Sequence, residues 1–126
     1  LGISGAVRFC GRIDDQALVL AYRRATVVAS ASVSEGWGMT LTEAAACGTP
    51  AVASDIDGHR DAVQHGTSGL LAADSVGIAA ALVEVTGNPA RRSELAAGAI
   101  RMAARFDWDR TATEAFRILA STVDRR

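Results

Sequence analysis

The chain has 126 residues and a mass of 13.0 kDa, which is the size of a single domain. All 13 of its basic residues are arginine and they stand against 14 acidic residues, so a net charge of −1 excludes the strongly basic surface that nucleic acid or an anionic membrane would require. Hydrophobic residues make up 49% of the sequence, which excludes a disordered chain, and no apolar run approaches the ~20 residues of a membrane-spanning helix.

Short apolar runs and helical spacings alternate along the sequence. Strands are indicated by the alternation of Val7 with Phe9 and by the β-branched run 26–31. Helix boundaries are marked by N-cap residues, by Pro89 at a first helical position and by Gly48 after a last one. The predicted elements are, in chain order, a strand over 7–10, a helix from Asp14 to Ala25, a strand over 26–31, a helix over 39–47, a strand over 51–54, a short helix over 59–63, a strand over 69–72, and three helices that begin at Ser75, Asn88 and Asp107.

This order, with no hairpin signal between the strands, predicts an α/β fold. We expect a parallel sheet with helices on both faces and the C-terminal helices packed alongside it. Ligands bind beyond the carboxyl ends of the strands in such sheets, so the candidate site lies in the loops over 11–15, 32–40 and 55–60. Cys10 and Cys47 have neither a metal-ligand spacing nor a disulfide framework, and we expect both to be buried, reduced thiols.

The most informative segment is EGWGMTLTE, residues 35–43, which follows a predicted strand and opens a predicted helix. Gly36 and Gly38 remove side chains where the backbone must bend and where a ligand must come close. The first amides of the helix, from Gly38 to Thr40, have no partners within the helix. Together with the helix dipole, these amides suit an anion such as a diphosphate.

Two carboxylates, Glu35 and Glu43, frame this anion site. A carboxylate would repel phosphate, but its two oxygens can accept hydrogen bonds from a pair of hydroxyls. A nucleoside diphosphate sugar has hydroxyls on both sides of its diphosphate, and the residue types therefore predict that ligand class. Each residue taken alone also fits a simpler hypothesis: Thr40 and Glu43 match a capping box, Glu35 a solvated loop residue, and Trp37 a packing residue.

The string EGWGMTLTEAAACGTPAVASD resembles the donor-site signature of retaining glycosyltransferases of the GT-B fold, the group 1 or family 4 type. That signature has two glutamates separated by seven residues, as Glu35 and Glu43 are. The similarity extends through VRFCGRIDD, HGTSGLL and FDWDRTA. The resemblance implies a Rossmann-like half of a GT-B enzyme that transfers a hexosyl group from a nucleoside diphosphate sugar to an acceptor hydroxyl, with retention at the anomeric carbon and without a metal or other cofactor.

The resemblance also implies a role for each residue of the donor site. Glu35, the implied catalytic residue, would hold hydroxyls of the transferred sugar, and Glu43 would bind the ribose. The remaining implied contacts are the backbone of Gly36, Trp37 and Gly38 to the sugar and the distal phosphate, the amides of Met39 and Thr40 to the diphosphate, and Ile13 and Asp15 to the nucleobase. Asp15 also suits the first turn of a helix, where the dipole favours an acid.

The sequence departs from the family pattern at several points. Ala31 and Ser32 stand where the family usually has Pro-Ser, and Asp61 stands where a Glu is common. His59 and His65 match no functional histidine of this domain, so we interpret them as loop residues. The two β-α units that normally open the domain, with an Arg and a Lys for the diphosphate, are missing from the chain. Residues 1–126 are therefore expected to be one partial donor-binding domain, inactive by itself, without the N-terminal domain that binds the acceptor.

The resemblance leaves the donor open between the GDP-mannose type, which the Ile13-Asp14-Asp15 turn slightly favours, and the UDP-hexose type. We expect no nucleic-acid partner and no transmembrane segment. The full-length protein would be cytoplasmic or peripheral to the inner face of the membrane. A free sheet edge over 7–10 would let the chain self-associate. The alternative function is a non-catalytic nucleotide-sugar-binding or interaction module on the same fold.

Overall fold

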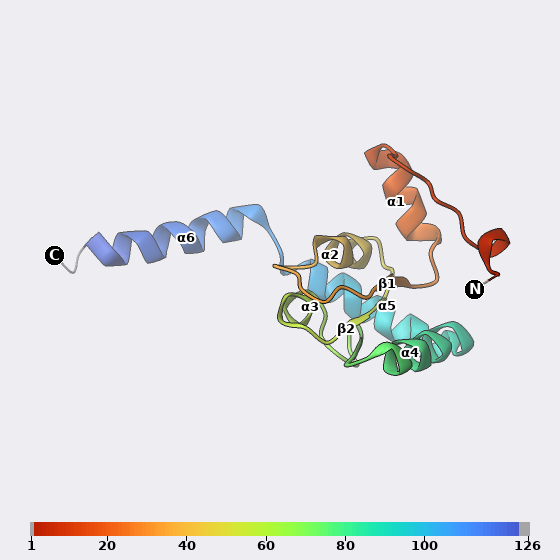
Figure 1. Ribbon diagram of the computed structural model, residues 1–126. Coiled ribbons are helices and arrows are strands. Elements are labelled where there is room, and N and C mark those ends of the chain that lie inside the picture. Colours follow the sequence, from red (N-terminus) through yellow and green to blue (C-terminus); the bar gives the residue numbers. More distant parts are fainter. Residues whose placement is uncertain (1, 124–126) are drawn as a thin grey trace.

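The computed structural model describes residues 2–123, which form a small α/β domain with one long helix that extends away from it (Figure 1). In chain order the elements are a 3₁₀ helix η1 (Ser4–Ala6), α1 (Asp15–Arg24), β1 (Val28–Ser30), α2 (Met39–Ala46), β2 (Ala51–Ser54), α3 (Asp57–Ala62), β3 (Gly69–Ala72), α4 (Ser75–Gly87), α5 (Pro89–Ala103) and α6 (Trp108–Val123). The predicted alternation of strands and helices is confirmed from β1 onward.

The sheet has three parallel strands in the order β1-β2-β3. Val28 pairs with Ala51, and Ala51 pairs in turn with Gly69, so each new strand is added on the same side. The helices α2 and α3 make the two crossovers that parallel pairing requires. The parallel α/β fold expected from the sequence is therefore confirmed, with β2 and β3 at the predicted residues and β1 shorter than the predicted run 26–31.

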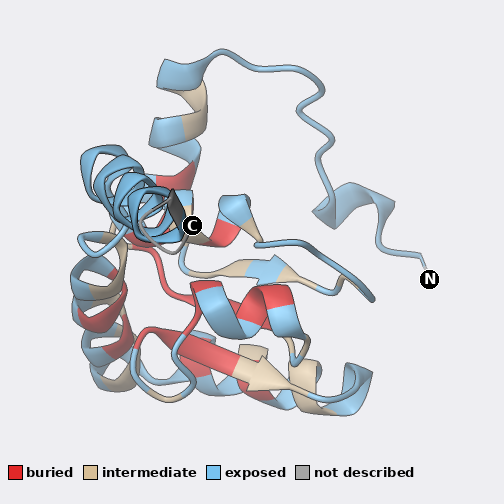
Figure 2. Ribbon diagram, turned by 90° about the vertical axis from the view of Figure 1, so that its left-hand side faces the viewer, coloured by how far each residue is buried: buried red, intermediate tan, exposed pale blue. Residues whose placement is uncertain are grey.

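The core has two halves because successive residues of β2 face opposite sides of the sheet. Ala51 and Ala53 pack with Leu41 of α2 and Val63 after α3. Val52 points the other way and packs with Val85 of α4 and Leu95 of α5. Figure 2 shows the buried residues gathered in the middle of the domain, on the sheet and on the helix surfaces that face it. Helices therefore cover both faces of the sheet, as expected.

Side-chain caps fix the starts of α1, α4 and α5. The Asp14 carboxylate accepts from the amide of Ala17 at 2.8 Å, and the Asn88 side chain accepts from Arg91 at 3.0 Å. The predicted cap at Ser75 is wrong, because Asp74 caps α4 by accepting from Gly77 at 2.7 Å. The prediction that both thiols are buried is also wrong, because Cys10 is exposed and Cys47 is only half-buried, although both are free cysteines as expected.

The predicted strand over 7–10 is wrong. The chain makes the 3₁₀ helix η1 and then runs without regular structure to α1, with Phe9 93% exposed. A strand forms only beside another strand, and residues 7–10 pair with no strand in the described part of the chain. The free edges of the sheet are β1 and β3, so the expected self-association through the 7–10 edge loses its structural basis.

The two C-terminal helices behave differently. Helix α5 packs against α2, α4 and β3, which confirms the expected packing beside the sheet for this helix. Helix α6 projects from the domain, and its described residues are exposed, including Phe116 and Leu119 at 75% and 65% (Figures 1 and 2). Packing alongside the sheet is therefore wrong for α6.

Candidate functional site

A polar hollow lies at the carboxyl ends of β1 and β2. It has a volume of about 330 Å³ and is formed by the loop after β1 and the start of α3. The residues that line it are Val33, Ser34, Glu35, Asp55, Ile56, Asp57 and Arg60. Two of the three loops expected to carry the site therefore meet here, at the strand ends where parallel sheets place their ligands.

Gly38 makes the turn into α2. It has φ +82°, a left-handed conformation that favours glycine, and a Cβ at this position would lie 3.0 Å from Cδ2 of His59. Gly38 is the N-cap, and its carbonyl accepts from Leu41 at 2.9 Å. The first amides of α2, including those of Met39 and Thr40, lie at the helix start, where no helical carbonyl precedes them.

The capping-box hypothesis for Thr40 and Glu43 is wrong. Thr40 lies within α2, and no side chain caps this helix. The Glu43 carboxylate instead accepts from the hydroxyl of Tyr22 on α1, at 3.0 Å. Burial of the phenol, with a smaller contribution from this hydrogen bond, raises the pKa of Tyr22 to about 12. Glu43 therefore joins α2 to α1, and its other carboxylate oxygen has no hydrogen-bond partner among residues 2–123.

Glu35 is held from two sides in an otherwise exposed loop. Its Oε1 accepts from the hydroxyl of Ser32 at 2.8 Å. Its backbone rests on Gly58 of α3, where a Cβ would overlap the Glu35 carbonyl oxygen. The exposed carboxylate of Glu35 thus has a fixed backbone and one hydroxyl partner, unlike a freely solvated loop residue.

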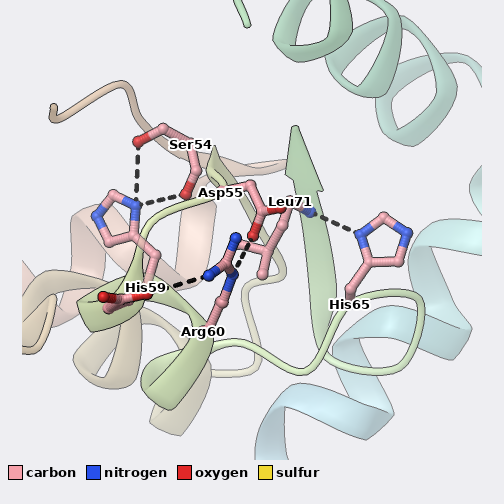
Figure 3. A network of polar contacts seen from close by, with 7 residues as sticks. Ser54, Asp55, His59, Arg60, His65 and Leu71 are labelled. Atoms are coloured by element: carbon pink, nitrogen blue, oxygen red, sulfur yellow. Dashed lines mark hydrogen bonds and ion pairs between the residues drawn. The ribbon is translucent and has the colours of Figure 1, made fainter. Parts of the chain in front are cut away.

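An ion-pair cluster borders the same hollow. Arg60 donates from Nε to Asp55 at 2.7 Å and from its NH1 nitrogen to Asp57 at 3.0 Å (Figure 3). The hydrogen bond from Arg60 lowers the pKa of the Asp55 carboxyl, and the same bond raises the pKa of the guanidinium. One guanidinium faces two carboxylates in this cluster, so it keeps one negative charge, and Glu35, which forms no ion pair among residues 2–123, adds a second to the hollow.

Trp37, the aromatic residue of the loop, contacts the segment that joins α5 to α6. The Trp37 ring meets Phe106, between α5 and α6, edge to face at 5.1 Å. This contact supports the packing hypothesis for Trp37. Gly36 beside it has open space on its Cβ side and no positive φ, so the backbone conformation here does not demand a glycine.

The structure brings together only part of the predicted site. Residues 35–40 lie around the start of α2, close to the strand ends. Asp15 lies on α1 and lines a different, largely apolar hollow of about 430 Å³ with Val19 and Leu20, and Ile13 precedes that helix. Glu43 does not line the hollow that holds Glu35.

Sequence reasoning missed three residues that shape this region. His59 is completely buried within α3, so its interpretation as a loop residue is wrong, whereas His65 does lie between α3 and β3. Tyr22 and Gly58 were not singled out. The sequence signal that could have pointed to Tyr22 is a polar hydroxyl on an apolar helix face. The signal for Gly58 is a glycine in the first turn of a helix.

An open parallel sheet with a glycine turn and a helix start at its carboxyl edge is the arrangement with which doubly wound α/β proteins bind their ligands. Residues 1–102 match the family model described as "Glycosyl transferases group 1". The chain belongs to this family.

Two of the relatives are bacterial glycosyltransferases. The D-inositol 3-phosphate glycosyltransferase of Frankia alni is 46% identical over 114 residues, which cover 89% of this chain and 28% of that protein. The enzyme of the same name from Thermobispora bispora is 38% identical over 127 residues, covering 99% of this chain and 30% of its own length. The chain therefore spans less than a third of these relatives.

Solved structures share the fold. Sucrose-phosphate synthase from Thermosynechococcus elongatus superposes with a TM-score of 0.86 at 28% identity, covering 98% of this chain and 32% of that one. HepE from Anabaena, in complex with UDP-glucose, superposes with a TM-score of 0.81 at 25% identity, covering 96% of this chain and 34% of that one.

Among the described helices, none is both long and apolar enough to cross a membrane.

Proposed function

We propose that the turn from Glu35 to Glu43 binds a nucleoside diphosphate sugar, and that the protein containing it transfers the sugar to an acceptor hydroxyl with retention at the anomeric carbon. One observation carries the proposal. Glu35, an acid held by Ser32 and Gly58, borders a polar hollow at the strand ends, next to a left-handed glycine that opens a helix. Family membership and the UDP-glucose complex of a structural neighbour support this ligand class.

The roles follow from the chemistry of each group. Glu35 accepts hydrogen bonds from hydroxyls of the transferred sugar. The backbone from Gly36 to Gly38 lies along the sugar and the distal phosphate, and the amides of Met39 and Thr40 face the diphosphate. Negative charge grows on the diphosphate as the glycosidic bond breaks, and preorganised amides at a helix start stabilise such charge.

The nucleoside occupies the side of the turn towards α1. Glu43 accepts from the ribose hydroxyls with the oxygen that Tyr22 leaves free. Ile13 and Asp15, at the start of α1, contact the base. Of the two donor types, we propose a UDP-hexose rather than GDP-mannose, because HepE, at 25% identity, is described in complex with UDP-glucose. The acceptor, by comparison with the relatives, is a phosphorylated cyclitol or a similar polyol held by another part of the protein.

Calorimetric titration of the intact polypeptide that contains this chain tests the proposal. UDP-glucose, GDP-mannose and their nucleotides are compared for the wild type, Glu43→Ala and Tyr22→Phe. Loss of two charge-assisted hydrogen bonds, about 3 kcal/mol, predicts a fall of about a hundredfold in nucleotide affinity for Glu43→Ala.

Tyr22→Phe is the matched control, because it removes the same hydrogen bond and keeps the carboxylate. If Glu43 serves only to join two helices, both variants will lose the same stability and neither will lose affinity, and the ribose role is then refuted. Tighter binding of GDP-mannose than of UDP-glucose would refute the choice of donor. Absence of binding to every nucleotide would refute the proposed function.

A further inference from the structure

The buried imidazole of His59 joins the ends of two strands. The residue is 0% exposed, and its Nδ1 lies 2.9 Å from the carbonyl oxygen of Ser54 and 3.2 Å from its hydroxyl, at the end of β2 (Figure 3). Its Nε2 lies 3.3 Å from the hydroxyl of Ser30, the last residue of β1. The ring is therefore clamped between the two strands whose carboxyl ends carry the site.

The hydrogens of this network can be assigned from the chemistry of the partners. A carbonyl oxygen only accepts, so Nδ1 carries a hydrogen and donates it to Ser54. The hydroxyl of Ser54 donates to the carbonyl oxygen of Ser32 at 2.5 Å. In the tautomer with its hydrogen on Nδ1, Nε2 is the acceptor of the ring, and the Ser30 hydroxyl donates to it at 3.3 Å. Two longer contacts surround these bonds: the Ser54 hydroxyl lies 3.2 Å from Nδ1, and the Ser30 hydroxyl lies 3.4 Å from that of Ser32.

The network ends at Glu35. Ser54 holds the backbone of Ser32, and the hydroxyl of Ser32 donates to Oε1 of Glu35 at 2.8 Å. The ring also supports the turn sterically, because Cδ2 of His59 lies where a Cβ on Gly38 would be only 3.0 Å away. A hydrogen-bonded path therefore runs from the buried ring to the carboxylate, and the same ring lies under the other end of the glycine turn.

We infer that His59 is a positioning residue for Glu35, which it fixes through Ser54 and Ser32 so that the carboxylate meets the hydroxyls of the donor sugar. This inference rests on the proposed function, because it requires Glu35 to contact the sugar. The diphosphate and the nucleoside lie on the other side of the turn. The network therefore acts on the sugar part of the ligand and not on the nucleotide.

The experiment compares affinities for UDP-glucose and for UDP in the intact polypeptide, with GDP-mannose and GDP as a second pair. Ser32→Ala removes the last link and leaves the buried ring untouched. His59→Leu removes every hydrogen bond of the ring, whereas His59→Asn keeps an amide donor near the position of Nδ1. Ser93→Ala, at an exposed position of α5, is the matched serine control.

We expect Ser32→Ala and His59→Leu to weaken UDP-glucose binding about tenfold, which is the scale of one hydrogen bond to a charged group, and to leave UDP affinity within about twofold. His59→Asn keeps most of the UDP-glucose affinity that His59→Leu loses. Ser93→Ala changes neither the UDP-glucose affinity nor the UDP affinity. If His59→Leu does not fold, Ser32→Ala and His59→Asn give the answer.

Two results overturn the inference while leaving the proposed function in place. One is a parallel loss of UDP and UDP-glucose affinity, which is what a merely structural role of the ring would cause. The other is an unchanged UDP-glucose affinity in Ser32→Ala. Failure of the wild type to bind any of the four probes overturns the proposed function itself, and the inference with it.

Discussion

Gly58 supports the loop that carries Glu35, and its replacement by alanine tests how tightly α3 and this loop are packed. An added Cβ would overlap the Glu35 carbonyl oxygen and would lie 2.8 Å from the carbonyl carbon of Glu35 and 3.0 Å from that of Gly36. Favourable carbon contacts need about 3.5 Å or more, so the loop must move by roughly 1 Å. Overpacking of this kind costs about 1–3 kcal/mol.

Thermal unfolding followed by circular dichroism measures this cost. For a chain of this length we expect a fall in Tm of roughly 4 °C for each kcal/mol. Gly36→Ala is the matched control, because a Cβ on Gly36 meets nothing within 4 Å. A Tm for Gly58→Ala equal to that of Gly36→Ala would refute the close packing of loop and helix that positions Glu35.

Two further predictions concern stability. The pKa of Tyr22 is raised to about 12, so the stabilisation from its protonated hydroxyl is complete below pH 10 and is lost as the pH rises through 12. Denaturant titrations should therefore show that, between these pH values, the free energy of unfolding falls by at most about 3 kcal/mol more in the wild type than in Tyr22→Phe. Equal falls in the two proteins would contradict the raised pKa. Asn88→Ala removes the cap of α5 and should lower the free energy of unfolding by about 1 kcal/mol in the same assay, whereas an unchanged value would show that this cap does not stabilise the helix.

The elements that sequence reasoning located carry their signals locally. Asn88 followed by Pro89 marks the start of α5 without reference to the rest of the chain, and Gly48, with φ +81°, follows the C-cap of α2 as predicted. The run AVAS is a central strand buried on both faces, and it was predicted at its observed residues. Each of these features depends on neighbours within a few positions.

The features that were missed depend on contacts between distant residues. Residues 7–10 have the alternation of a strand, but a strand also needs a neighbouring strand to pair with. The sequence of this segment does not show whether one is present. His59 is polar, yet Ser30 lies 29 positions away and completes the set of hydrogen bonds that allows it to be buried. Glu43 has the spacing of a capping box, but its partner Tyr22 is 21 positions earlier. Residue type alone indicated a loop position for His59 and a local capping role for Glu43.

The edge-to-face pair of Trp37 and Phe106 links the glycine turn to the direction in which the polypeptide leaves the domain. Phe106 lies two residues before α6 begins, so the ring that packs on Trp37, beside the proposed diphosphate contacts, also stands where the chain turns outward into the projecting helix.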